Sequence, residues 1–215
     1  IFNDIIEKLN IKKNDKVLLI GGGCGSIIRL WLEKTKDLKL KLSILDFPKV
    51  IKSLERYISK LDYQLELNFI EGIFPQVDVN DNFDCIEVYS VIHYSDHPFE
   101  IIDSAVELLK PYGRLLIGDI PNLSRKGRFL ASNAGRQFEA KYQDTDLSNV
   151  KIYDNHKDFV FYNLEKGALE ITDENLFELL LSYRNKGYDT FILNQNDKLP
   201  FSKTREDILI IKPPL

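Results

Sequence analysis

The chain has 215 residues, and 29 Lys and Arg against 33 Asp and Glu give it a formal net charge of −4 and a pI near 5.5. This length suits a single α/β domain, and the acidic balance provides no positive field for gathering long nucleic acids. No run of about 18 apolar residues and no signal-peptide core are present, so we expect a cytoplasmic protein that binds neither nucleic acid nor membrane. With two Cys and three His, the sequence excludes a thiolate-rich zinc site and gives no disulfide framework, and it supports no assignment of metal ligands.

The first half of the chain alternates apolar runs with helical periodicity, which is typical of β-α-β units in a parallel sheet. A short leading helix is expected over residues 1–10. Strands are expected at 16–20, 40–45, 65–70, 84–89 and 113–118. Helices are expected at 26–34, at 49–60 after Pro48, and between Pro98 and Pro111.

Four glycines follow the first expected strand within five positions: Gly21, Gly22, Gly23 and Gly25. Without β-carbons, such a loop adopts unusual φ/ψ values and lets a ligand approach the backbone closely. Asp46 ends the second expected strand roughly 20 residues further on, where an acceptor for the ribose hydroxyls of an adenosine-type cofactor is expected. The two features together predict a nucleoside-binding βαβ unit.

The regular alternation stops after the fifth expected strand. Residues 121–171 are polar, aromatic and only patchily periodic, and they are too long for an ordinary loop, which suggests a lid or substrate-binding insertion. A helix is then expected over 173–185, capped by Thr172 and ended by Gly187. Two last strands at 188–193 and 207–211 have no helix between them and must pair antiparallel if they are adjacent.

A parallel sheet that ends in such a hairpin, with a G-x-G-x-G loop after its first strand, resembles the class I S-adenosylmethionine-dependent methyltransferases. The resemblance covers Val17 to Pro121 in four ordered segments, VLLIGGGCG, LSILDFP, FDCIEVYSVIHY and LLKPYGRLLIGDIP. It implies an α/β fold, a Rossmann-like seven-stranded mostly parallel sheet with helices on both faces and a C-terminal antiparallel hairpin. Residues 1–215 are then one methyltransferase-like domain with the insertion at about 121–171.

Three positions depart from the pattern of this family, and one of them, Tyr112, replaces a usual glycine in a turn away from the chemistry. The family has Asp or Glu two residues before the first glycine, where this sequence has Leu19. Its acidic residue near the adenine falls on Ile73, next to an offset acid, Glu71. These departures leave open a module of this fold that binds without turnover.

The resemblance also implies roles for individual residues around S-adenosylmethionine. Asp46 accepts the ribose hydroxyls, although it also suits a helix cap, and Phe47 packs on the adenine or belongs to the core. The base is lined by Glu71, Gly72 and Ile73, which otherwise form a turn and core. Tyr89 and Ser90, after the fourth strand, contact the methionine part.

His93 is the candidate general base or acceptor-orienting residue, against the alternative of a structural hydrogen bond. The basic stretch that contains Arg125 and Arg128 predicts a site for an anionic acceptor, although a solvated helix face explains it equally. Asp119 either binds the acceptor or caps its loop. His156 either reaches over the pocket from the insertion or is solvated.

Other cofactor classes fit less well. A nicotinamide fingerprint needs a third glycine where Ser26 stands, and no Gly-Lys-Ser/Thr follows the loop as a P-loop requires. We therefore expect methyl transfer from S-adenosylmethionine to a small molecule. The tail LPFSKTREDILIIKP resembles methyltransferases associated with surface-polysaccharide sugar biosynthesis. This resemblance implies that the acceptor is a hydroxyl of a sugar or nucleotide-sugar, and N-methylation of another small metabolite is the alternative.

Overall fold

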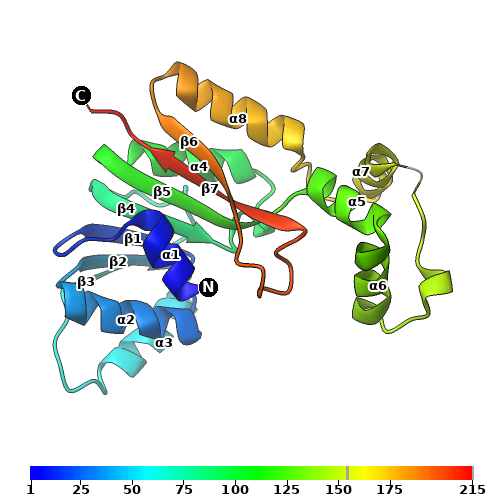
Figure 1. Cartoon of the computed structure of the whole chain (residues 1–215). Coiled ribbons are helices and arrows are strands. Elements are labelled where there is room, and N and C mark those ends of the chain that lie inside the picture. The colour runs from blue at the N-terminus through cyan, green and yellow to red at the C-terminus, as the bar shows by residue number, and fades with distance from the viewer. Residues whose placement is uncertain (154, 215) are drawn as a thin grey trace.

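A computed structural model describes residues 1–153 and 155–214, which form one seven-stranded sheet flanked by helices (Figure 1). The strands are β1 (Lys16–Ile20), β2 (Lys41–Asp46), β3 (Leu67–Glu71), β4 (Phe83–Tyr89), β5 (Leu109–Pro121), β6 (Asp189–Asn194) and β7 (Arg205–Ile211). Their order is β3-β2-β1-β4-β5-β7-β6, and β7 runs antiparallel to both of its neighbours while the other pairs are parallel. The fold class predicted from the sequence is therefore confirmed, including the closing hairpin.

Helices cover both faces of the sheet. They are α1 (Phe2–Leu9), α2 (Ser26–Leu38), α3 (Pro48–Ile58), α4 (Pro98–Glu107), α5 (Leu123–Ala131), α6 (Asn133–Tyr142), α7 (His156–Glu165) and α8 (Asp173–Asn185), with 3-10 turns at Ile92–Tyr94 and Leu147–Asn149. One apolar cluster joins α1, α2 and α3 to the sheet, and a second joins α4 and α8 to the opposite face. Alternate β1 residues explain the two clusters, because Leu19 belongs to the first and Leu18 to the second.

Local sequence explains most element ends. Thr172 caps α8 through a capping box with Asn175, and Gly187 follows the helix at a φ of +88°. The helix α2 continues to Leu38, beyond the predicted end at residue 34. The prediction that Pro111 closes α4 is wrong: α4 ends at Glu107, and Pro111 lies in the irregular first part of β5, where pairing with β4 shifts register.

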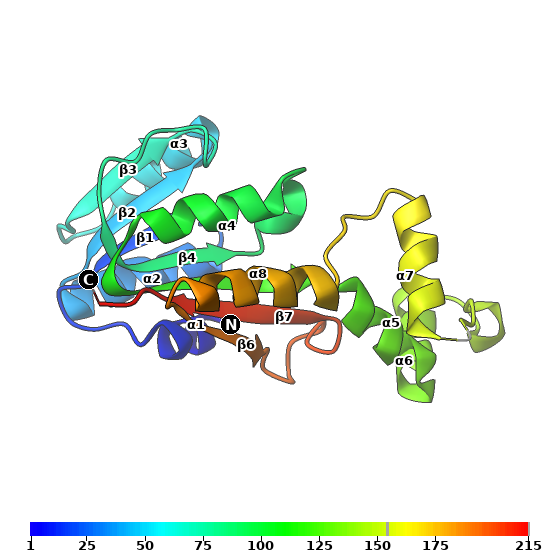
Figure 2. The ribbon, with the colours of Figure 1, turned by 90° about the horizontal axis from the view of Figure 1, so that it is seen from above.

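Residues 121–171 are mostly helical. The helices α5, α6 and α7 extend from the end of β5 away from the sheet, as two perpendicular views agree (Figures 1 and 2). Leu130, Ala140, Val150 and Phe159 are buried in this segment yet belong to neither of the two core clusters. We call α5 to α7 the helical extension. Its patchy periodicity in the sequence is explained by short helices that bury few residues each.

Candidate active site

The glycine loop leaves the carboxyl end of β1 in a conformation that needs glycine. Gly21 and Gly23 have φ values of +70° and +65°. A β-carbon on Gly21 would lie 2.5 Å from Cγ2 of Val91, so this position excludes any side chain on steric grounds as well. The loop ends at Gly25, where α2 begins. The backbone of the glycine loop is therefore accessible from solvent at the carboxyl ends of the strands.

Asp46 closes one side of this loop. Its Oδ2 accepts a hydrogen bond from the backbone N–H of Gly23 at 2.8 Å, and its Oδ1 accepts one from the N–H of Phe47 at 2.7 Å. The carboxylate is largely buried, and α3 is capped at Phe47 without a side-chain hydrogen bond, so the helix-cap alternative for Asp46 does not hold. A carboxylate offers about four acceptor positions, so roughly two remain for a ligand.

The residues predicted to surround the adenine lie along the same edge. Glu71 ends β3 directly opposite Asp46, and the N–H of Gly72 donates to the carbonyl of Asp46 at 3.1 Å. The side chains of Phe47 and Ile73 are 56% and 51% exposed. Their alternative assignment to the core is therefore wrong, and both present apolar surface beside the loop.

A cavity of about 250 Å³ adjoins the loop at the ends of β1, β4 and β5. It is lined by Ile1, Ile20, Gly21, Gly22, Ile27, Trp31, Glu87, Tyr89, Ser90, Asp119, Gln195, Leu199, Pro200 and Phe201. The predicted residues at the methionine end thus share a cavity with the predicted acceptor residue Asp119. Asp46 and the adenine-side residues lie outside it, on the open continuation of the same edge.

Two residues at the cavity hold strained backbone. Ser90 and Asp119 have φ values of +59° and +60°, an unusual region for residues other than glycine. The Ser90 hydroxyl donates to Oδ2 of Asp119 at 2.8 Å, and Arg205 donates to the same oxygen at 2.8 Å. Asp119 is therefore held by a side chain that directly follows β4 and by one at the start of β7.

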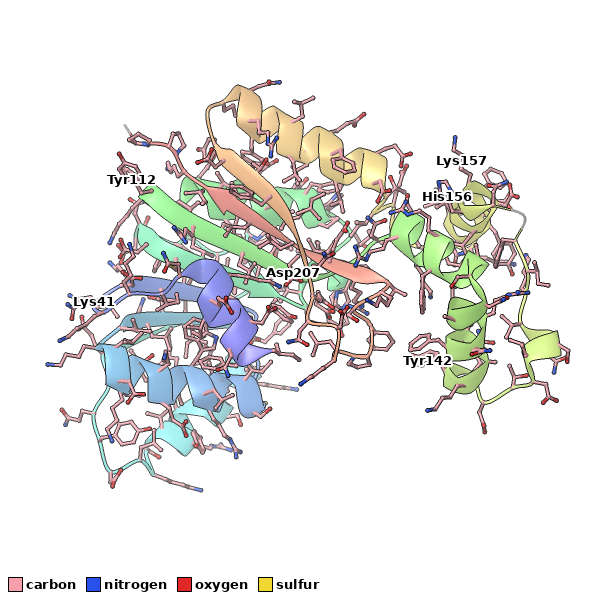
Figure 3. The ribbon with its side chains drawn as sticks, viewed as in Figure 1. Lys41, Tyr112, Tyr142, His156, Lys157 and Asp207 are labelled. Atoms are coloured by element: carbon pink, nitrogen blue, oxygen red, sulfur yellow. The ribbon has the colours of Figure 1, made fainter. Side chains whose placement is uncertain are left out.

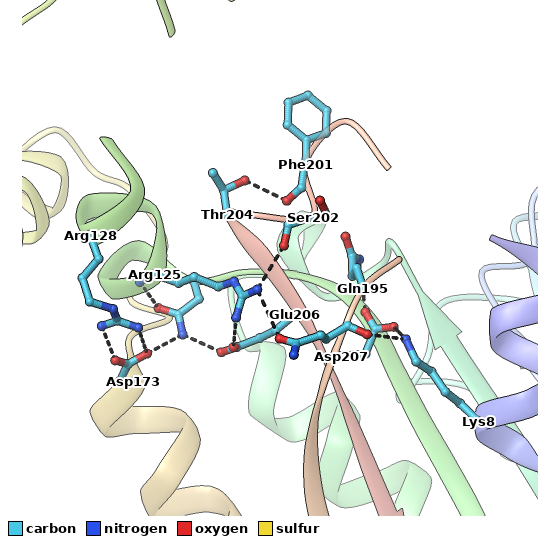
Figure 4. A network of polar contacts seen from close by, with 12 residues as sticks. Lys8, Arg125, Arg128, Asp173, Gln195, Phe201, Ser202, Thr204, Glu206 and Asp207 are labelled. Carbon is cyan, nitrogen blue, oxygen red and sulfur yellow. Dashed lines mark hydrogen bonds and ion pairs between the residues drawn. The ribbon is translucent and has the colours of Figure 1, made fainter. Parts of the chain in front are cut away.

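Asp119 belongs to a buried polar network with Gln195, Asp207 and Lys8, and the last three residues are shown in Figure 4. The Nε2 of Gln195 donates to Asp119 at 3.2 Å and to Asp207 at 3.1 Å. Asp207, which is fully buried, also accepts from the N–H of Asp119 at 2.9 Å and from Lys8 at 2.7 Å. Burial alone lowers the pKa of Lys8, but its hydrogen bonds to Asp207 and Asp4 outweigh this and raise it.

The side chain of Tyr89 lies between the glycine loop and this polar network. Burial raises the pKa of its phenol, and the charges of Asp207 and Asp119 raise it further. Its ring lies over Gly118, where a β-carbon would come within 2.1 Å of the ring. Gly118 is thus required by the position of Tyr89.

His93 lies in the short turn after β4, outside the residues that line the cavity. Burial lowers its pKa, Arg205 lowers it further, and Asp119 acts in the opposite direction. Its Nδ1 is buried and has no hydrogen-bond partner among the described residues. The imidazole is therefore neutral at pH 7, next to the residues that hold Asp119.

Comparisons with known proteins address the fold. No family profile and no curated protein matches the sequence. Solved structures do match: the plantazolicin methyltransferase BpumL, in complex with a triazolic desmethyl analogue and SAH, is 15% identical with a TM-score of 0.59, over 99% of this chain and 81% of that one. The chain has the class I methyltransferase fold.

Two further matches of this fold carry SAH, which is S-adenosylhomocysteine. The plantazolicin methyltransferase BamL is 17% identical, covers 98% of this chain and 81% of its own, and has a TM-score of 0.58. The N-methyltransferase NodS from Bradyrhizobium japonicum is 14% identical, covers 100% and 86%, and has a TM-score of 0.59. At these identities the likeness fixes the methyltransferase fold, and the chemistry has to be argued from the residues.

Within this methyltransferase fold, the basic residues predicted to bind an acceptor are occupied by carboxylates of the chain itself (Figure 4). Arg125 contacts Glu206 at 3.4 Å, and Arg128 contacts Asp173 at 2.5 Å. Both arginines thereby attach the helical extension to β7 and α8. The structure gives no support to their predicted role in binding an anion, because their charge is already compensated.

His156 begins α7 in the helical extension, far from Asp207 in the view of Figure 3. It does not line the cavity. Its backbone packs against α5, where a β-carbon on Gly127 would lie 3.0 Å from the His156 carbonyl oxygen. The predicted reach of His156 over the pocket is not seen in the structure.

Several cavity residues were not predicted from the sequence. Glu87, in the middle of β4, carries a signal that is visible in retrospect, because an acid interrupts the apolar run FDCIEVY. Trp31 of α2 is 1% exposed and belongs to a core cluster, and it also lines the cavity. Gln195 and Phe201 come from the loop between β6 and β7, whose sequence shows no comparable signal.

Metal binding and membrane insertion are two further properties on which the described residues bear. Across residues 1–153 and 155–214, no group of three or more His, Cys, Asp or Glu side chains is arranged to hold a metal ion. Within the same residues, no helix has the length and apolar character needed to cross a bilayer.

Proposed function

We propose that this chain transfers a methyl group from S-adenosylmethionine to a small-molecule acceptor. The observation that carries the proposal is the 2.8 Å hydrogen bond between the Gly23 N–H and the Asp46 carboxylate, beside a cavity that continues toward Asp119. Open α/β sheets bind ligands at the carboxyl ends of their strands, and this is the edge concerned. Had the loop and the acid been far apart, one adenosine would not reach both.

The residues present fit the cofactor. Asp46 keeps roughly two acceptor positions for the ribose hydroxyls, and no atom lies within 4 Å of the β-carbon positions of Gly23 and Gly25, so a ligand can approach the loop backbone there. The exposed ring of Phe47 offers a flat apolar surface to the adenine. The amino-acid end would lie toward Tyr89 and Ser90, in the cavity.

When bound, S-adenosylmethionine supplies an electrophilic methyl group on a sulfonium for in-line displacement. The protein has to orient the acceptor, exclude water and remove a proton from a hydroxyl acceptor. Asp119, fixed by Ser90, Gln195 and Arg205, provides a preorganised acceptor of hydrogen bonds. We propose that the neutral imidazole of His93, in the turn after β4, removes that proton.

The acceptor side of the cavity is aromatic. Phe201 lines the cavity, and its ring packs edge-on against Phe138 and Tyr142 of α6, while the guanidinium of Arg205 lies 5.3 Å from its centroid. Aromatic walls with a few convergent polar groups suit a small organic molecule. A sugar hydroxyl is our specific candidate, supported by rings beside the Asp119 carboxylate, and an amine is the alternative.

Two experiments test the proposal in order. Calorimetry with S-adenosylhomocysteine should show one site, and absence of binding for it and for S-adenosylmethionine would refute the cofactor assignment. Labelled S-adenosylmethionine should then transfer label to nucleotide sugars in preference to small amines. Label found only on amines would replace the sugar with a nitrogen acceptor, and binding with no transfer to any acceptor would indicate a binding module.

A further inference from the structure

Glu87 is an acid within an apolar environment. It lies in the middle of β4, its side chain is 5% exposed, and its neighbours on that face of the sheet include Cys85 and Trp31. A buried charge is costly unless it is paired, so an acid at such a position requires an explanation. Glu87 plays no part in the polar network around Asp207, and none of the steps described above uses it.

Its position is next to the glycine loop. In the parallel pairing of β1 and β4, Glu87 lies directly opposite Leu19, two residues before the loop begins. Together with Gly21 and Gly22 it lines the cavity of about 250 Å³. A ligand that touches the loop backbone and enters this cavity therefore meets the Glu87 carboxyl.

This carboxyl has no counter-ion among the described residues. It forms no ion pair or hydrogen bond there that meets normal distance criteria, and no Lys, Arg or His lines the cavity. The indole nitrogen of Trp31 is near enough to lower its pKa slightly, yet that nitrogen is itself buried without a hydrogen-bond partner. Burial dominates and raises the pKa of Glu87 to about 8.

We propose that Glu87 is the receptor for the ammonium group at the amino-acid end of the cofactor, and that it makes the site specific for ligands carrying that group. This inference rests on the proposed function. An ammonium enters the cavity with three N–H donors, and a buried carboxylate without a competing cation is its natural partner. Glu87 then has no counter-ion among the described residues because its cation arrives with the cofactor.

The order of the loop favours the cofactor over the acceptor as the source of this cation. Gly23 contacts Asp46 on the ribose side, whereas Gly21 and Gly22 line the cavity. A molecule whose adenosine occupies the Asp46 side thus extends past Gly22 and Gly21 toward Glu87. Asp119, at the other end of the cavity, is already compensated by Arg205 and is the poorer partner for a cation.

The pairing of Glu87 with an ammonium group should change the number of protons bound to the protein. At pH 7 the free protein holds Glu87 mostly protonated, and an ammonium favours its ionised form, so binding should release close to one proton per site. The other residues with titratable groups that line the cavity are Tyr89, Asp119 and Ile1, which carries the α-amino group of the sequence as given, and Asp4 and Asp207 act on Tyr89 from behind. The raised pKa of the Tyr89 phenol means that this group does not release a proton near pH 7.

The test compares two ligands and two variants by calorimetry. S-adenosylhomocysteine carries the ammonium, and 5′-methylthioadenosine has the same nucleoside without the amino-acid end. Glu87→Gln keeps the size of the side chain and removes its charge, so it should weaken S-adenosylhomocysteine binding about tenfold or more and leave 5′-methylthioadenosine within about twofold. Glu66→Gln, at an exposed position just before β3, is the matched control and should change neither affinity.

Proton release is measured on the wild-type protein, so the inference does not depend on a variant that folds. Binding enthalpies in buffers of different ionisation enthalpy should give nearly one proton released with S-adenosylhomocysteine and none with 5′-methylthioadenosine. Between pH 6 and 7 the affinity for S-adenosylhomocysteine should rise about tenfold. Equal affinities in Glu87→Gln, or no proton release, would overturn the role of Glu87, whereas wild-type protein that binds neither ligand would instead overturn the proposed function.

Discussion

Replacement of Asp46 by Ala tests the cofactor site most directly, because one carboxylate supports both the loop and the proposed ligand. The substitution removes the acceptors for the N–H groups of Gly23 and Phe47, at 2.8 and 2.7 Å. Loss of these two bonds should cost about 2 kcal/mol of folding free energy, and hence lower Tm by about 4–8 °C. Loss of the ribose contacts should cost a further 1–3 kcal/mol of binding, or roughly 5- to 150-fold in Kd.

The two effects are separated by measuring Tm and the Kd for S-adenosylhomocysteine on the same preparations. Asp46→Asn keeps one acceptor oxygen and should lose less in both measurements than Asp46→Ala. Asp62→Ala, at an exposed position after α3, is the control and should leave both unchanged. A lowered Tm with an unchanged Kd would show that Asp46 only supports the loop, and the reasoning about the ribose would be refuted.

Three other predictions concern the walls of the cavity and its support. Gly118→Ala places a β-carbon 2.1 Å from the Tyr89 ring and should cost about 1–3 kcal/mol in urea unfolding, and a smaller loss would mean that the ring moves freely. Lys8→Met leaves the fully buried Asp207 without its cation and should cost about 3 kcal/mol or more of unfolding free energy in the same assay. A loss below about 1 kcal/mol would contradict this account of Lys8. Burial lowers the pKa of His93, so with a hydroxyl acceptor kcat should rise with pH with a midpoint below about 6.5, and a midpoint above that value would argue against His93 as the base.

The sheet was predictable because its signals are local. Apolar runs gave the strands, and β1 agrees with its prediction at both ends, Lys16 and Ile20. The capping residue Thr172 likewise gave the start of α8. The errors lie where tertiary contacts decide. Pro111 is tolerated in β5 because the pairing with β4 is irregular there, and the helical extension has too small a core to impose a clear period.

The residues of the candidate site likewise divide into those that the local sequence predicts and those that tertiary contacts decide. Asp46 and the glycine loop were predictable because their chemistry depends on backbone conformation and strand ends, which the local sequence encodes. The roles expected of Arg125 and Arg128 depended on whether carboxylates elsewhere in the chain reach them, and their partners Glu206 and Asp173 are remote in sequence. Local charge therefore predicted a basic surface where the fold makes ion pairs.

The strained residues at the cavity show how the parallel strands β4 and β5 are joined there to the closing hairpin of β6 and β7. Ser90 directly follows β4 and Asp119 lies in the last part of β5, both with positive φ values, and such a conformation persists only where the surroundings fix it. Here the fixing groups come from the closing hairpin, since Gln195 follows β6 and Arg205 begins β7. The hairpin that completes the sheet therefore also sets the geometry of the acceptor side, so changes in the loop between β6 and β7 should alter acceptor choice before they alter cofactor affinity.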